Sequence, residues 1–303
     1  MGLLARLPAP LKRRLREGYG IARARFVDTF LAYDTDRFAE CLARLGVAQG
    51  DTVLLHSSFA ANHGYRGSIG GLIDALLAAV GPDGNLMMVS LPYRTSSLHY
   101  LANLKEFDVR STPSMMGLVS EYFRRRENVV RSLHPTHPIL ACGARAEWIV
   151  AAHPDCLYPC GPATPFDRLL ELDGKVLFFN VPFAVFTFFH YLEHLVEPDL
   201  PFRLYTDQPF HVPVIDRTGE RRTVETFVFS EEAIRRRRFP VLERELRRRG
   251  LIHGRRLGNG RVEVIRVRDA VACVEDMRRE GRYFYDLSDL PRVRRLGREG
   301  QMQ

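Results

Sequence analysis

The sequence lacks a hydrophobic run long enough to cross a membrane as a helix. Its most apolar stretch, residues 176–189 (VLFFNVPFAVFTFF), is too short and contains Asn180 and Pro182. The first twenty residues carry Arg and Pro where a secretion signal would have an apolar centre. We therefore expect a cytoplasmic protein.

Cysteine is scarce and forms no framework pattern. Five cysteines occur at irregular spacing, namely Cys41, Cys142, Cys156, Cys160 and Cys273. Cys156 and Cys160 lie four positions apart, but the second Cys or His pair of a zinc ribbon is missing. This pattern argues against a disulfide scaffold, so we expect structural thiols in a reducing compartment.

Lysine is almost absent. Lys12, Lys105 and Lys175 are the only lysines, and arginine supplies the rest of the 44 basic residues. With 36 acidic residues, the net charge is +8. A basic surface favours anionic partners, and arginine suits phosphate in particular. For most of these arginines an ordinary solvated surface is the simpler interpretation.

The common nucleotide-binding motifs are also missing. The stretch RGSIGG, residues 66–71, precedes a predicted helix, and the first amides of a helix attract anions. However, it has neither the Gly-Lys-Ser/Thr of a P-loop nor the G-x-G-x-x-G of a dinucleotide-binding turn.

The hydrophobic pattern from residue 35 to 181 alternates between helices and strands. Helices are predicted over 35–45 (with Thr35 or Asp36 as the N-cap), 69–80, 114–126 and 144–153, and strands over 52–56, 85–90, 138–143 and 175–181. Strand–helix–strand order predicts a layered α/β/α fold with a mixed, largely parallel central sheet. Residues 92–115 are predicted to be a long irregular connection.

Beyond Pro201 the pattern changes. It predicts a hairpin around residues 216–219, one very basic helix over 231–250, and a strand followed by a helix over 258–281. We divide the chain into a basic arm (1–33), one domain (34–290) and a basic, disordered tail (291–303). The arm could touch an anionic membrane surface, although a helix packed on the domain is the simpler interpretation.

The segment His190-Tyr191-Leu192-Glu193-His194 matches H-x-x-E-H, a zinc-peptidase pattern. On a helix both histidines would share one face. Zinc would need a third protein ligand, which no spacing marks, and Pro198 and Pro201 end the helix early. The pattern has only three fixed positions, so a zinc hydrolase is kept as an alternative and no bound metal is expected.

Two further polar clusters accompany predicted strands. His56, Ser57 and Ser58 follow the first strand, where ligands of open α/β sheets bind. The segment RSLHPTHPI contains Arg131, Ser132, His134 and His137, and it suits either a turn or an anion contact. Each signal is weak by itself.

In combination and order, these segments resemble the aminoglycoside 3-N-acetyltransferase family. The resemblance covers residues 34–290 and rests on five stretches, which are 46–59, 70–88, 107–143, 153–181 and 187–194. Within them, "HSS", "TPSxMG", "RSxHP" and "T-x-x-H-x-x-E" are the most specific parts. The resemblance implies a single α/β/α unit and an enzyme that moves an acetyl group from acetyl-CoA to an amine.

The resemblance also implies roles for particular residues. His190, in the T-x-x-H-x-x-E segment that starts at Thr187, would be the general base, and Glu193 would assist it. CoA would lie near Ser57 and Ser58 and near Arg131, Ser132 and His134, and Asp108 is assigned to the acceptor. His194 is not part of the family pattern.

The chemistry of acetyl transfer fits these side chains independently. An acceptor amine is mostly protonated at neutral pH and must lose a proton before it attacks a thioester, and histidine is suited to take it. A route through an acyl-cysteine at Cys142 or Cys156 is the rival mechanism, but neither lies in a Cys–His frame. Direct transfer is preferred.

The charge of the chain bears on the acceptor. Aminoglycosides are polycations and call for a carboxylate-rich pocket, whereas this chain is basic. We therefore expect another amino sugar or amine metabolite. A non-catalytic basic protein that binds RNA through residues 235–249 is the alternative of a different class, although no RNA-binding aromatic motif accompanies it. The oligomeric state is left open, with a dimer as one option.

Overall fold

A computed structural model describes residues 11, 18, 20, 22, 25–60 and 63–290. Most of the predicted arm and the whole predicted tail lie outside these residues. The part of the arm that is described packs on the domain, because Val27 is buried and Asp28 accepts hydrogen bonds from Arg66. No helix in the described ranges is long and apolar enough to span a membrane.

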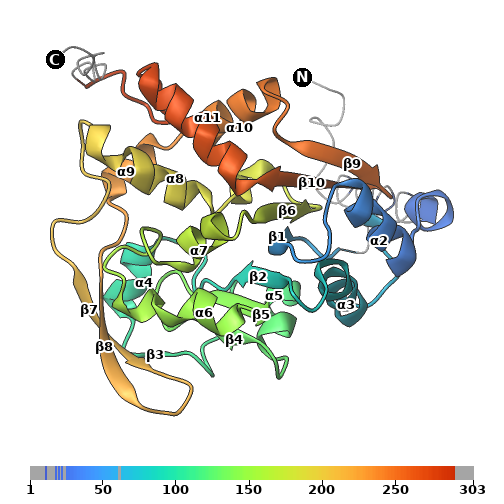
Figure 1. The fold of residues 1–303 in the computed structure, drawn as a ribbon, viewed down its shortest axis with the longest axis horizontal. Coiled ribbons are helices and arrows are strands. Elements are labelled where there is room, and N and C mark those ends of the chain that lie inside the picture. Colours follow the sequence, from blue (N-terminus) through green and yellow to red (C-terminus); the bar gives the residue numbers. More distant parts are fainter. Residues whose placement is uncertain are drawn as a thin grey trace.

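A seven-stranded mixed sheet forms the centre, in the order β4-β5-β2-β1-β6-β10-β9 (Figure 1). Its strands are β1 (Thr52–Ser57), β2 (Asn85–Val89), β4 (Val130–Arg131), β5 (Ile139–Gly143), β6 (Lys175–Phe179), β9 (His253–Leu257) and β10 (Gly260–Arg266). Strands β2, β1 and β6 are parallel, and the flanking strands are antiparallel. The mixed sheet is confirmed, but its parallel part is limited to the three central strands, since β9–β10 and β4–β5 are antiparallel pairs of consecutive strands.

Alternate residues of the strands supply two hydrophobic cores. Leu54 of β1 faces a core shared with α6 (Ala146–Ala151), α7 (Pro165–Glu171), α8 (Phe189–Val196), α10 (Phe239–Arg248) and α11 (Val267–Arg279). Val53 and Leu55 face the other core, with α2 (Thr35–Arg44), α3 (Ile69–Val80) and α5 (Leu118–Arg124). This is the predicted α/β/α layering, and it follows from the period of two along each strand. The N-cap of α2 is Asp34 instead of Thr35 or Asp36.

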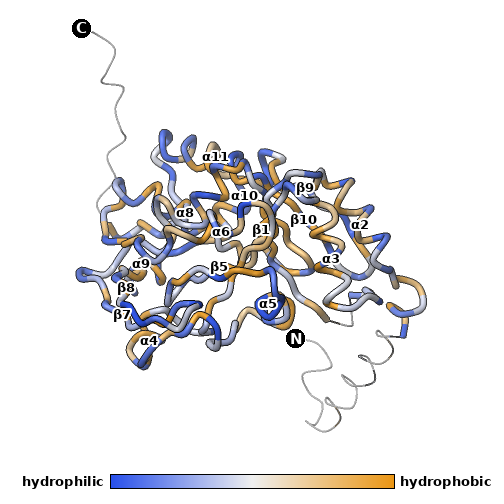
Figure 2. The backbone as a smooth tube through the Cα atoms, turned by 60° about the horizontal axis from the view of Figure 1, so that its bottom comes forward, coloured by the Kyte–Doolittle hydropathy of each residue, from blue (hydrophilic) through white to orange (hydrophobic). Residues whose placement is uncertain are grey.

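A smaller sheet stands beside the main one. It contains β3 (Phe107–Asp108), β7 (Phe210–Ile215) and β8 (Arg221–Thr226), and α4 (Ser97–Asn103) packs with it. The predicted hairpin is confirmed as β7–β8. Residues 92–115 are not the irregular connection that was predicted, because they contain α4 and β3. Figure 2 shows β5 in the main sheet as hydrophobic.

The basic segment 231–250 is two helices and not one. Helix α9 (Glu231–Arg236) ends before Arg237, and α10 begins at Phe239 with Pro240 in its first turn. Proline has no amide to donate to the carbonyl four residues before it, and its ring crowds that carbonyl, so one continuous helix cannot run from Arg236 through Pro240. Arg237 has φ −53° and ψ 136°, which takes it out of the helical course and allows its side chain to reach α8.

Two glycines with positive φ allow a test of why the end of β5 requires glycine. Gly143, at the end of β5, has φ 131°, and a Cβ there would lie 2.1 Å from the Gly84 carbonyl oxygen. Gly46 has φ 79°, and a Cβ there would meet nothing within 4 Å. We expect Gly143→Ala to lower the free energy of unfolding by about 3 kcal/mol or more, and Gly46→Ala by about 1 kcal/mol. Urea unfolding measures both, and equal losses would contradict this account of Gly143.

Candidate active site

The segment that runs from β6 into α8 carries the predicted base. After β6 the chain makes a short 3₁₀ turn, Phe183–Val185, and α8 then begins at Phe189. His190 and Glu193 lie one helical turn apart, and His190 Nδ1 is 2.7 Å from Glu193 Oε2. The structure thus brings together the two residues that the sequence assigned to catalysis.

Glu193 is completely buried, with 0% of its surface exposed. Its second oxygen, Oε1, accepts hydrogen bonds from Arg237 Nε at 2.6 Å and from the Tyr285 hydroxyl at 2.5 Å. The carboxylate therefore receives three charged or polar partners from three separate segments of the chain. Such satisfaction is what a buried charge requires.

These contacts define the charge states. Burial opposes ionisation of Glu193, but the charge of Arg237 and the hydrogen bond with His190 hold the pKa of this carboxyl below its usual range. Burial, aided by the charge of Arg237, also lowers the pKa of His190, against the opposing effect of Glu193. At neutral pH the imidazole is therefore neutral. It donates from Nδ1 to the carboxylate and keeps a lone pair on Nε2, which is the form of a general base.

The side of His190 away from Glu193 is mostly aromatic. The Phe229 ring lies 4.9 Å from the imidazole, between ring centroids, and the His137 ring lies 5.8 Å away. The Arg237 guanidinium lies over the Phe229 ring at 4.5 Å. No described residue hydrogen-bonds His190 Nε2, so this nitrogen is available to a substrate.

A pocket adjoins this segment at the carboxyl ends of β1 and β2. It has a volume of about 250 Å³, and its lining is mainly apolar, with His56, Ser57, Ser120 and Thr187 as polar members. Ser57 lines this pocket. Ser58 is not part of its lining, and its backbone amide donates to the Phe179 carbonyl of β6.

His56 connects this pocket to the catalytic segment. Its Nε2 accepts from the Thr187 amide at 3.4 Å and lies 3.2 Å from the Thr187 hydroxyl. Burial lowers the pKa of His56 to about 3, so the ring is neutral and can accept. Sequence reasoning placed His56 at the end of a strand but gave it no role. The available signal was the threonine of the T-x-x-H-x-x-E pattern, Thr187, because its hydroxyl needs a hydrogen-bond partner and His56 provides it.

The segment Arg131–His134 is buried and occupied by bonds within the protein. Arg131 donates to the carbonyls of Ser90 and Thr112 and lies over the Phe107 ring, and burial lowers the pKa of its guanidinium to about 9. The Ser132 hydroxyl accepts from the Ile139 amide. The structure does not bring these groups to the pocket lined by Ser57. Instead, Arg131 holds residues 90–112 against the main sheet.

His134 belongs to a stack of buried imidazoles. Its ring stacks on His153 at 4.3 Å, and its Nδ1 accepts from the His137 amide at 3.1 Å. His153 Nε2 donates to the Pro159 carbonyl, so its Nδ1 accepts from Ser132. Burial lowers the pKa of His134, His137 and His153, and all three rings are neutral at neutral pH. The stacked rings of His134 and His153 pack behind His137, and the His137 ring in turn faces His190.

The remaining predicted residues lie apart from this pair. Asp108 is bonded to Arg110, whose side-chain hydrogen bonds lower the pKa of the carboxyl to about 2. His194 Nδ1 lies 3.0 Å from the Tyr205 hydroxyl. In the described ranges no cluster of three or more His, Cys, Asp or Glu side chains is placed to hold a metal ion.

The two candidate cysteine nucleophiles are held as thiols. Burial raises the pKa of Cys156 to about 11, and its Sγ donates to the Ala152 carbonyl. Burial also raises the pKa of Cys142. Neither makes a hydrogen bond with a histidine among the described residues. Thiolate character is what an acyl-accepting cysteine needs, and both environments oppose it.

Arg237 and Tyr285 were missed by sequence reasoning. Arg237 lies in a run of four arginines, from which no local pattern distinguishes it, and Tyr285 lies 92 positions after Glu193. The available signal for Arg237 was Pro240, because a proline interrupts a helix and the chain leaves the helical conformation at Arg237.

The charge of Arg237 leads to a prediction for the base. Arg237 disfavours the imidazolium of His190, so Arg237→Gln should raise the pKa of His190 and shift loss of the neutral form to higher pH. NMR titration of the His190 ring measures this shift without any substrate. The neighbouring Arg238 pairs with Asp286, so Arg238→Gln is the matched control. An unchanged or lowered pKa in Arg237→Gln would contradict the assignment.

Comparison with known proteins gives a consistent result. The sequence profile described as "Aminoglycoside 3-N-acetyltransferase" matches residues 54–279. Aminoglycoside N(3)-acetyltransferase IV of Salmonella sp is 34% identical over 233 residues, which is 76% of this chain and 82% of the relative.

Two solved structures show the same fold. The apoenzyme of aminoglycoside acetyltransferase AAC(3)-IVa superposes with a TM-score of 0.65 and 30% identity, covering 81% of this chain and 88% of that one. AAC-IIIb, solved as a binary complex with CoASH, has a TM-score of 0.66 and 24% identity, covering 80% and 94%. The profile match and the 34% identical relative agree. The chain belongs to the aminoglycoside 3-N-acetyltransferase family and is an N-acetyltransferase, a class of acyltransferase.

Proposed function

We propose that the protein transfers the acetyl group of acetyl-CoA directly to an acceptor amine, with His190 as the general base. The observation that carries this proposal is the neutral imidazole of His190, which Glu193 orients through Nδ1 while Nε2 stays free. Relatives are named for N-acetyl transfer, and one family structure holds CoASH. Direct transfer is preferred because burial keeps Cys142 and Cys156 as thiols.

In this mechanism His190 Nε2 takes a proton from the acceptor amine as its nitrogen attacks the thioester carbonyl. The new C–N bond forms, the C–S bond breaks, and the CoA thiolate leaves and takes a proton from the imidazolium. Glu193 stabilises the transient imidazolium through its hydrogen bond, and Arg237 and Tyr285 keep the carboxylate ionised and in place.

The pocket lined by Ser57 is the proposed site for the pantetheine end of acetyl-CoA. It is narrow and mainly apolar, and the imidazole of His56 and the hydroxyls of Ser57 and Thr187 lie along it. These features suit a flexible chain that contains amides and ends in a thioester. Arg131, Ser132 and His134 would support this site through the strand and loop that they hold, rather than through contact with CoA.

The two histidines of H-x-x-E-H give a test that separates acetyl transfer from zinc hydrolysis. We expect His190→Ala to lower kcat by about 10²–10⁴-fold, the usual contribution of a general base, with binding of acetyl-CoA retained. His194→Ala should change kcat by less than about tenfold, because His194 contacts Tyr205 and not the proposed base pair. Equal losses in both variants, or metal in the purified protein, would support the zinc site instead.

The charges around His190 bear on the acceptor. Glu193 is neutralised by Arg237, and Asp108 is neutralised by Arg110. Among the described residues Glu193 is the one carboxylate whose charge acts on the pKa of His190, and the Phe229 and His137 rings also lie beside this imidazole. We propose an acceptor with a single amine, such as a neutral or anionic amino sugar, instead of a polycationic aminoglycoside.

An acceptor panel tests this proposal. With acetyl-CoA saturating, kcat/KM should be at least about tenfold higher for glucosamine or its 6-phosphate than for gentamicin, because Glu193, beside His190, is paired with Arg237 and is not left to attract a polycation. His190→Ala is the matched control, since it should abolish turnover of every acceptor. Turnover of gentamicin alone would refute the acceptor class but leave acetyl transfer intact.

A further inference from the structure

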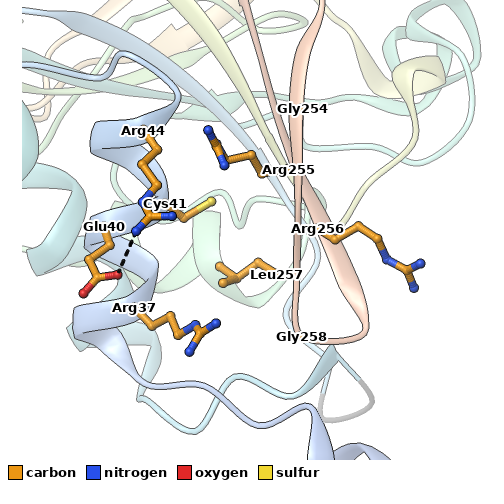
Figure 3. Close-up of a pocket in the computed structure, with 9 residues that line it drawn as sticks. All are labelled: Arg37, Glu40, Cys41, Arg44, Gly254, Arg255, Arg256, Leu257 and Gly258. Atoms are coloured by element: carbon orange, nitrogen blue, oxygen red, sulfur yellow. Dashed lines mark ion pairs between the residues drawn. The ribbon is translucent and has the colours of Figure 1, made fainter.

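A second pocket lies on the far flank of the main sheet from β4. It is formed between helix α2 and strand β9, and its volume is about 530 Å³ (Figure 3). It shares no lining residue with the pocket that contains Ser57. Nothing in the proposed acetyl transfer uses it.

Three arginines face this pocket from two elements. Figure 3 shows Arg37 and Arg44 projecting from α2 and Arg255 from β9, whereas Arg256 turns to the other side of the strand. The positive charges of Arg255 and Arg44 both act on the thiol of Cys41, at the base of the pocket, where they oppose the rise in its pKa that burial causes. The guanidinium groups therefore converge on one space.

These arginines have little compensating charge. Most arginines of the described chain pair closely with a carboxylate, as Arg236, Arg247 and Arg278 do. By contrast, Arg37 and Arg255 have no ion pair with a described residue. Arg44 has only Glu40, at 4.0 Å and with both side chains about two-thirds exposed (65% and 66%). The pocket thus has a local excess of positive charge, whereas most other described arginines pair with a carboxylate.

The backbone adds further donors. Strand β9 is the last strand of the sheet and pairs only with β10 in the described structure. The outer edge of such a strand presents N–H groups without strand partners. Arginine forks and free amides are the groups that bind phosphate oxygens.

We propose that the pocket between α2 and β9 binds a small molecule that carries two or more phosphate groups, such as a nucleoside di- or triphosphate. The volume is in the range of small-ligand sites and far exceeds the space of one phosphate. Three guanidinium groups suit several phosphates better than one. No aromatic side chain of a described residue lines the pocket, so the phosphates and not a stacked base supply the recognition.

Calorimetry on the full-length protein saturated with CoA tests the site. Tripolyphosphate and ATP should each bind with a stoichiometry of one, and AMP should bind more weakly. The double variant Arg37→Gln/Arg255→Gln should weaken binding of tripolyphosphate by about hundredfold, from about tenfold for each lost charge-assisted contact. The matched control is Arg235→Gln/Arg244→Gln, which removes two exposed arginines outside the pocket that also have no ion pair with a described residue, and it should change the affinity by less than about twofold.

Several results would overturn the proposal. Absence of binding by wild type, or equal weakening in the control variant, would show that the arginines only raise the surface potential. Competition between tripolyphosphate and CoA would assign the phosphates to CoA itself. Tight binding of single-stranded RNA that ATP does not displace would point to a nucleic acid. Because each readout is binding, failure here would leave the proposed acetyl transfer untouched.

Discussion

Glu193 has no exposed surface, and an ionised carboxylate in such a place is costly unless opposite charge and hydrogen bonds compensate it. Its three partners come from α8 itself, from the break between α9 and α10, and from the chain after α11. Removing any one of them would leave a buried charge partly unpaired. The carboxylate therefore ties the C-terminal third of the protein to the proposed base on α8, and the position of the His190 ring depends on that connection.

The buried histidines extend the same principle. His134 and His153 are neutral because burial disfavours the cation. The tautomer of His134 follows from the His137 amide, which donates to its Nδ1, and that of His153 follows from the Pro159 carbonyl, which accepts from its Nε2. Each ring can therefore be satisfied in only one orientation. Glu193 orients the proposed base, His190, and His134 orients His137, whose ring faces His190. These hydrogen bonds have one direction each, and they hold Nε2 of His190 in place.

The sequence predicted the layers, the hairpin and the pair His190–Glu193, because these depend on local periodicity and on short motifs. It did not predict the antiparallel flanks of the sheet, since strands as short as β4 carry little pattern. It also assigned Arg131 to CoA by analogy, whereas the structure places its guanidinium on backbone carbonyls. A buried arginine and an exposed one look alike in a sequence. Burial is decided by the packing of distant elements such as β3 and β4.

Arginine pairing also decides between the broader functional alternatives. The basic helix that suggested RNA binding has Arg247, Arg248 and Arg249 in ion pairs with Glu263 and Glu245. Paired charges produce little field at a distance, so this helix lacks the free basic face that phosphate backbones need. The net charge of +8 is thus a poor guide to where anions bind. The proposed phosphate site shows this, because α2 and β9 place Arg37 and Arg255, which have no ion pair with a described residue, at one pocket although they lie far apart in the sequence.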